Sequence, residues 1–149
     1  MEVILREILF KATFACLFLA MSGCIEETHL KAQISSNDVG VIVDVVNVKP
    51  FSENGTEKSL VYGSLAFEDL KHIAARVNLT CIAISIGDIK SENIYVDSVA
   101  YILPESYKLN GDQKKVSVYW KMNKQLNAGS AGKELKVFIR EGCNLLMKA

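Results

Sequence analysis

The chain has 149 residues, of which 50% are hydrophobic, and its 17 basic and 17 acidic residues give a formal net charge of zero. A neutral chain of this length has room for one domain and no general electrostatic attraction to nucleic acid, which argues against a nucleic-acid-binding function. The sequence contains no GxGxxG, GxxxxGKS/T or CxxC motif, so we expect no cofactor and no metal.

Residues 1–23 have the parts of a secretory signal peptide. Arg6 and Lys11 supply positive charge, residues 12–21 form an apolar run, and the small residues Ser22 and Gly23 follow. A transmembrane helix needs about 20 apolar residues, so this run is too short to span a bilayer. The alternative is a buried core helix, but Arg6 and Lys11 would interrupt its apolar face. We therefore expect a signal peptide.

The end of this signal, residues 19–24 (LAMSGC), resembles the lipobox of bacterial lipoproteins. In that family the signal peptide is cleaved just before the cysteine, whose thiol receives a diacylglycerol. The resemblance implies that the mature chain begins at Cys24 and is held in a membrane by acyl chains, several of which anchor a protein almost permanently. In enterobacterial lipoproteins an aspartate after the cysteine favours the inner membrane. Ile25 stands there instead, which predicts an outer-membrane protein facing the periplasm.

Residues 24–38 are polar and show no sustained periodicity. Such a composition is typical of a flexible linker, so we expect these residues to form a tether between the lipid and the folded domain. The domain itself is then expected over residues 39–149.

The first expected strand, residues 39–48, is rich in valine. β-branched residues favour strands, and Pro50 is expected to end this one because proline cannot donate to a strand ladder. A polar turn over residues 52–57 is centred on an Asn-Gly pair. The next strand is expected over residues 60–67.

Residues 65–77 fit two structures. Apolar residues recur at helical spacing from Phe67 to Val77, whereas the composition on both sides favours strands. We expect strand, short turn and strand, with the second strand over residues 77–86. A helical turn near residues 69–75 remains the alternative.

Four further segments of the chain complete the pattern. Residues 94–103 form a strand by composition, and Pro104 closes it. Residues 107–109 and 116–120 flank an Asn-Gly turn, which is the strongest short hairpin signal, and residues 135–140 alternate as the last strand. About seven short strands separated by turn residues predict an all-β fold, the immunoglobulin-like β-sandwich.

Several segments of the domain also carry a resemblance. They are an aromatic strand at residues 61–67, the Leu-Thr-Cys at residues 79–81, the YKLNGD at residues 107–112, and a last strand that runs into Gly142-Cys143. With these features the domain resembles a family of small exported bacterial proteins of unknown function with an immunoglobulin-like sandwich. The resemblance implies that fold and a disulfide, and it implies no catalytic or binding residues.

The chain has four cysteines. Cys16 leaves with the signal peptide and Cys24 carries the lipid, so Cys81 and Cys143 remain. Two thiols in an oxidising compartment usually pair, and we expect a disulfide between them. The alternative is two buried free cysteines that act as small hydrophobic residues.

One group of residues could carry chemistry. Glu68 and Asp69 precede His72 by four and three residues, so on a helix the three side chains would share a face. They could hold a metal or orient a base, but such groups are more often solvated, and a zinc site normally uses three well-placed ligands. Trp120 and Tyr119 are expected in the core rather than at a ligand platform.

We therefore expect a lipid-anchored, non-enzymatic interaction module that faces the periplasm and binds an unidentified protein partner. An immunity-type inhibitor that captures a toxin at the membrane and an envelope-assembly or adhesion accessory both fit this description. The alternative is a small envelope hydrolase or metal-binding protein that uses Glu68, Asp69 and His72. Fold alone does not decide between them.

Overall fold

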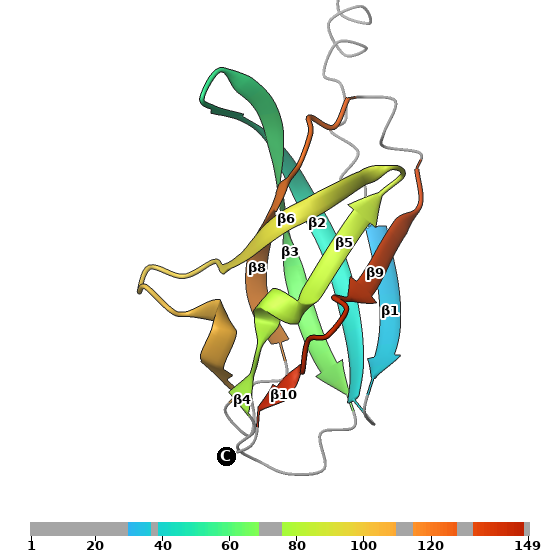
Figure 1. Cartoon of the computed structure of the whole chain (residues 1–149), viewed down its shortest axis with the longest axis vertical. Helices are drawn as coiled ribbons and strands as arrows, with labels where there is room; N and C mark the ends of the chain where they lie inside the picture. Colours follow the sequence, from blue (N-terminus) through green and yellow to red (C-terminus); the bar gives the residue numbers. More distant parts are fainter. Residues whose placement is uncertain (1–29, 37–38, 69–75, 110–114, 128–132, 148–149) are drawn as a thin grey trace, which may run out of the picture.

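A computed structural model describes residues 30–36, 39–68, 76–109, 115–127 and 133–147 of the chain (Figure 1). This part consists of antiparallel strands and two 3₁₀ turns without an α-helix, so the all-β prediction is confirmed. No helix among these residues is long and apolar enough to cross a bilayer. The elements are β1 (Leu30–Ser36), β2 (Val39–Glu53), β3 (Thr56–Glu68), β4 (Arg76–Val77), η1 (Leu79–Cys81), β5 (Ile82–Ile86), β6 (Ile89–Val96), η2 (Pro104–Ser106), β7 (Tyr107–Lys108), β8 (Lys115–Met122), β9 (Leu135–Ile139) and β10 (Leu146–Met147).

Seven strands form one curled sheet in the order β1-β2-β3-β8-β6-β5-β9, and β10, β4 and β7 form a small second sheet. The two outer strands of the large sheet, β1 and β9, lie side by side without ladder pairs between their described residues, so the sheet is nearly barrel-shaped (Figure 1). The immunoglobulin-like sandwich is therefore not confirmed. A single curled sheet stands where two stacked sheets were expected.

Two local features bend the longest hairpin of this sheet, formed by β2 and β3. A bulge interrupts the register between Val45 and Asn47, and bulges increase the local twist of a strand. Opposite the bulge lies Gly63, where an added Cβ would collide with the Asp44 carbonyl oxygen. Only glycine allows the two backbones to approach this closely.

The turn of the same hairpin is the expected Asn-Gly pair. Asn54 and Gly55 have φ angles of 52° and 76°, and the flanking residues Glu53 and Thr56 pair across the hairpin. Two-residue turns with positive φ at both positions match the twist of the strands, and asparagine and glycine tolerate this conformation best. The predicted turn is confirmed.

The prediction that Pro50 ends the strand is wrong. β2 continues to Glu53, and Pro50 pairs with Ser59 of β3. The described pairing of β1 with β2 reaches Val45, and among the described residues β2 is an edge strand beyond it. A proline on an edge strand removes no ladder bond when its nitrogen faces outward.

The expected tether is too long. Residues 30–36, which lie inside the predicted tether of residues 24–38, form β1 and pair with β2. Leu30, Ala32 and Ile34 alternate with exposed neighbours and pack against the core, a period of two that the polar composition obscured. The other residues of the predicted tether, like the signal peptide, lie outside the described residues.

Two expectations in the second half of the chain are also wrong. β6 ends at Val96, so residues 97–103 are not a strand. β7 pairs with β4 rather than β8, because both edges of β8 are taken by β3 and β6. The helical alternative at residues 69–75 and the Asn-Gly turn within residues 110–114 lie outside the described residues.

The interior of the curled sheet is apolar, and Trp120 lies fully buried within it. Its indole N–H donates to the Ile82 carbonyl at 3.3 Å, so its one polar group is satisfied. Trp120 is therefore a core residue, as expected. Tyr119 is half-buried and belongs to the other face of the sheet.

Candidate binding groove

An open groove of about 830 Å³ lies where β5 and β6 separate. Its walls are β6, the segment of residues 97–103 with η2, and a corner formed by η1 and the segment after β9. Figure 1 shows β6 leaving the line of β5 and running on toward residues 97–103, above η1 and η2. Pockets that hold small ligands measure roughly 300–1,000 Å³, so this groove is large enough to be a binding site.

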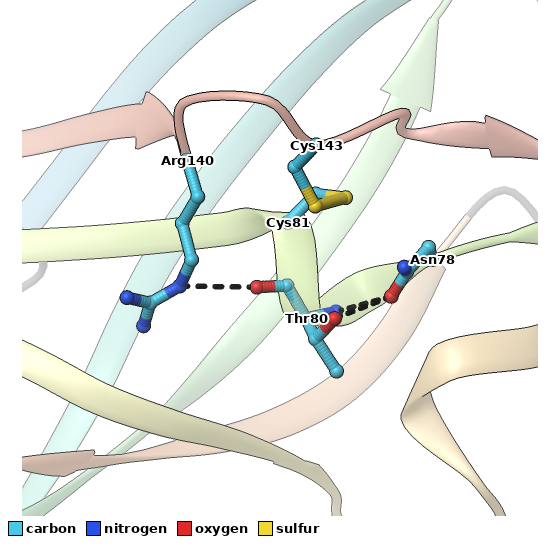
Figure 2. The surroundings of a disulfide bond; sticks show 5 residues. All are labelled: Asn78, Thr80, Cys81, Arg140 and Cys143. Atoms are coloured by element: carbon cyan, nitrogen blue, oxygen red, sulfur yellow. Dashed lines mark hydrogen bonds between the residues drawn. A yellow bond between two sulfur atoms is a disulfide. The ribbon is translucent and has the colours of Figure 1, made fainter.

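The disulfide between Cys81 and Cys143 closes the corner of the groove. It joins η1 to the segment after β9, with the two Cα atoms 5.5 Å apart and a sequence separation of 62 between the cysteines (Figure 2). The predicted disulfide is therefore confirmed. Asn78 fixes η1 from the other side, because its side-chain oxygen accepts a hydrogen bond from the Thr80 N–H at 3.1 Å.

Arg140 ties the same corner to β6. Its Nε donates to the Thr80 carbonyl at 3.1 Å (Figure 2), and its Nη2 donates to the carbonyls of Ser91 at 3.3 Å and Glu92 at 2.8 Å. These carbonyls have no ladder partner where β5 and β6 diverge, and the guanidinium group satisfies them. We did not identify Arg140 from the sequence, since a single arginine at the end of a strand carries no signal.

β6 presents an open backbone edge to the groove. Its pairing with β5 ends at Lys90, whereas its pairing with β8 continues to the end of the strand. Just beyond, the Asp97 N–H donates to the Ser117 carbonyl at 2.9 Å. Because bonding residues alternate in an antiparallel ladder, the N–H and C=O groups of Ile94 and Val96 point away from β8. In the described part of the chain no strand pairs with this stretch.

Apolar side chains are exposed on the segment of residues 97–103, which forms the rim of the groove. The relative exposure of Val99 is 110% and that of Tyr101 is 91%, and Ile102 and Leu103 are also exposed. Single exposed apolar residues are ordinary, but a contiguous group beside a groove is typical of an interaction site.

The charged side chains of the groove are Glu92, Glu105 and Arg140. Glu92 forms ion pairs with Lys58 at 2.9 Å and Lys121 at 3.7 Å, and Arg140 is held by backbone carbonyls. Glu105 is exposed and has no ion-pair partner among the described residues. The carboxylate of Glu105 is therefore the charge that a ligand would meet.

A row of three tyrosines crosses the outer face of the sheet and reaches the groove. The Tyr62 and Tyr119 rings stack with centroids 5.3 Å apart, and the Tyr119 and Tyr95 rings stack at 5.0 Å. The Lys49 ammonium group lies 4.8 Å from the centroid of Tyr62. Burial, and then the neighbouring tyrosines, raise the pKa of Tyr119, so its hydroxyl stays protonated and can donate a hydrogen bond.

The residues that the sequence singled out for chemistry do not form a site in the described structure. Glu68 is exposed at the end of β3, while Cys24, Asp69 and His72 lie outside the described residues. No group of three histidine, cysteine, aspartate or glutamate side chains among the described residues could hold a metal ion. The hydrolase and metal-binding alternative thus remains a prediction.

We compared the chain with family models, curated proteins and solved structures, and none of them matches it. The function of the groove must therefore be inferred from its own residues. In the described structure its unpaired strand edge, its exposed apolar rim and the Glu105 carboxylate are the chemistry from which a ligand can be inferred.

Proposed function

We propose that the protein is a lipid-anchored, non-enzymatic interaction module of the bacterial cell envelope that binds a protein partner in the groove beside β6. The lipobox-like segment that ends at Cys24 supports the anchor, and the residue after it supports an outer-membrane location facing the periplasm. One observation carries the binding proposal: a groove of about 830 Å³ joins an apolar rim to an unpaired strand edge. Both features are used in protein recognition.

The charged groups of the groove also support recognition rather than chemistry. Arg140 is committed to three backbone carbonyls, and Glu92 is committed to two lysines. Both side chains hold the walls of the groove in position, which is what a preformed binding site requires.

Two kinds of partner agree with this proposal. An immunity-type inhibitor would hold a toxin at the membrane, and an envelope-assembly or adhesion accessory would hold a component of the envelope. A toxin gene beside the gene of this protein favours the first, and its absence favours the second.

A photo-cross-linking amino acid in place of Tyr101 tests the groove in the full-length protein in intact cells. Tyr101 is exposed on the rim, and Val48, which is exposed on β2, provides the matched control. We expect a discrete protein adduct from position 101 and none from position 48. Equal labelling from both positions, or none from either, would contradict a partner in the groove.

The anchor has its own test. Cys24→Ala should abolish the incorporation of labelled fatty acid and either release the protein from the membrane or leave its precursor uncleaved. The domain should still fold, as checked by circular dichroism. Fatty acid that still enters the Cys24→Ala protein would exclude lipidation at this residue.

A further inference from the structure

We propose that the open edge of β6 takes an extended segment of the partner protein as an additional β-strand. The backbone of Ile94 and Val96 would exchange hydrogen bonds with this segment. This inference rests on the proposed function, since it names how the partner binds in the groove. It also states the chemical class of the partner segment: extended, with apolar side chains and a basic residue.

The first argument for strand addition is the backbone of β6. Between Lys90 and the end of the strand, β8 satisfies one edge of β6, and no described strand pairs with the other edge. Arg140 caps only the carbonyls of Ser91 and Glu92. The donors and acceptors that follow are aligned as in a sheet and have no partner among the described residues, which is the arrangement to which an added strand binds.

The second argument for strand addition is the position of this edge in the groove. An open strand edge on a convex surface invites pairing with any chain, whereas Ile94 and Val96 line a groove. The wall opposite them includes Thr80 and Cys143, and the disulfide fixes its place. A segment can enter only if its own side chains fit between these walls, so the groove selects among extended chains.

The side chains around the edge define the occupant. Val99 and Tyr101 offer apolar contacts at the rim, and Glu105 is the carboxylate without an ion-pair partner among the described residues. An extended chain places alternate side chains on opposite sides, so one side meets the rim while a basic residue reaches Glu105. This combination favours a peptide over a membrane, which would engage the apolar rim but leave the backbone edge unpaired.

A synthetic peptide of alternating lysine and valine, about ten residues long as in a long strand, is the probe. It is added to the full-length protein in detergent, and amide hydrogen exchange is followed residue by residue. We expect saturable binding that slows exchange of the Ile94 and Val96 amides at least about tenfold. The same peptide with an N-methyl group on every residue, which has no backbone N–H to donate along either edge, should lose this effect. A glutamate–valine peptide should bind more weakly.

Two proline variants provide the matched comparison. Val96→Pro removes an N–H that points away from β8 into the groove. Val48→Pro removes an outward N–H from the open edge of β2, two residues before the native Pro50. We expect Val96→Pro to weaken peptide binding about tenfold or more, which corresponds to at least ~1.4 kcal/mol, and Val48→Pro to leave it unchanged. If Val96→Pro fails to fold, binding of the parent and N-methylated peptides is compared on the wild-type protein, and this comparison decides whether a strand is added.

The outcomes separate this inference from the proposed function. Equal binding of the parent and N-methylated peptides, or no binding of either, overturns strand addition, while an adduct from position 101 would keep the groove as an interface. Absence of an adduct from position 101 would contradict the proposed function itself. Binding of the Cys24→Ala protein to anionic lipid vesicles through the rim would overturn a peptide occupant, and so would a dimer that Val96→Pro dissolves.

Discussion

Two open stretches of strand edge within the described part of the large sheet differ in how they are protected. The edge of β2 beyond Val45 carries a bulge, Lys49 and Pro50, three features that discourage another strand from pairing. The edge of β6 beyond Lys90 has no lysine or proline, its own bulge between Ser91 and Asn93 comes before Ile94 and Val96, and it lies inside a groove. The β2 edge is protected by its own residues, whereas the β6 edge is protected by its surroundings.

Because of this difference, the walls of the groove determine which chains can pair with the β6 edge. A proline removes a backbone donor for every partner, but a recess blocks only partners that do not fit. The Cys81–Cys143 disulfide and Arg140 set the position of the wall opposite β6. Changes at these residues should affect the β6 edge and leave the β2 edge alone, and changes near the β2 bulge should do the reverse.

Loss of the disulfide should have the largest effect. A bridge that closes a 62-residue separation stabilises a domain by roughly 4 kcal/mol in the chain-entropy treatment, an upper figure because strain in the folded state is ignored. We expect Cys81→Ala/Cys143→Ala to lower the free energy of unfolding in urea by several kcal/mol. Hydrogen exchange at Tyr95, whose N–H faces β8, should accelerate more than exchange at Lys49, whose N–H faces β3. A loss below about 1 kcal/mol would mean that the bridge does not hold the groove wall.

Gly63→Ala should affect the β2 edge and leave the β6 edge alone. Its Cβ would meet the Asp44 carbonyl oxygen, so the hairpin must shift at the bulge, and overpacking of this kind costs about 1–3 kcal/mol. Gly40→Ala is the matched control, because the nearest atom to its Cβ is the Glu68 Cβ at 3.4 Å, an ordinary contact. We expect a lower thermal midpoint for Gly63→Ala alone. Equal midpoints for the two variants would exclude a close approach of β2 and β3 at the bulge.

Arg140→Met should have an intermediate effect centred on the groove. The substitution keeps much of the side-chain length but removes the donors to three carbonyls, and hydrogen bonds to charged groups contribute about 1.5–3 kcal/mol. Arg76→Met is the control, since Arg76 is exposed and donates to the Ser106 hydroxyl at 3.0 Å. We expect a loss near 2 kcal/mol for Arg140→Met and within about 0.5 kcal/mol for Arg76→Met. Similar losses would show that Arg140 does not hold the wall.

The parts of the structure that the sequence predicted are those with a local cause. The Asn54-Gly55 turn follows from residues that tolerate positive φ, and most strands follow from β-branched runs. The disulfide followed from the expected cellular compartment and the number of cysteines, without any geometry. Each of these inferences needs only a short stretch of chain or a count.

The parts that the sequence did not predict depend on partners far away in the chain. Pro50 is tolerated because no described strand pairs with the outer edge of β2 beyond Val45, and β7 joins β4 because β8 is already paired on both edges. The groove exists because β5 and β6 separate after Lys90, and Arg140 matters only because carbonyls from two other segments meet it there. No local pattern encodes such pairings, so neither the curled sheet nor its groove could be read from composition.

A cluster of four charged residues connects the two edges and should give the smallest effect. Glu53, near the open end of β2, accepts hydrogen bonds from Lys58 at 3.0 Å and Lys121 at 2.9 Å. Lys58 also donates to Glu92 of β6 at 2.9 Å. Hydrogen bonds, first from Lys121 and then from Lys58, lower the pKa of Glu53. Hydrogen bonds to Glu92 and then to Glu53 raise the pKa of Lys58, and Glu53 raises the pKa of Lys121.

The signs of these shifts predict a pH window. Because the pKa of Glu53 is lowered on folding, its contribution is complete above the ordinary glutamate pKa of about 4.3 and is lost as the pH falls through the lower pKa of the folded protein. Because the pKa of Lys121 is raised, its contribution to the free energy of unfolding is complete below about pH 10.4 and is lost at higher pH.

Lys121→Met should therefore flatten the pH profile of the free energy of unfolding at both ends, by a small and salt-sensitive amount since these groups are solvent-accessible. Lys124→Met, at an exposed lysine just beyond β8, is the control for lost charge. Equal flattening by both variants in urea titrations across this pH range would mean that net charge, and not the cluster between the two edges, sets the dependence.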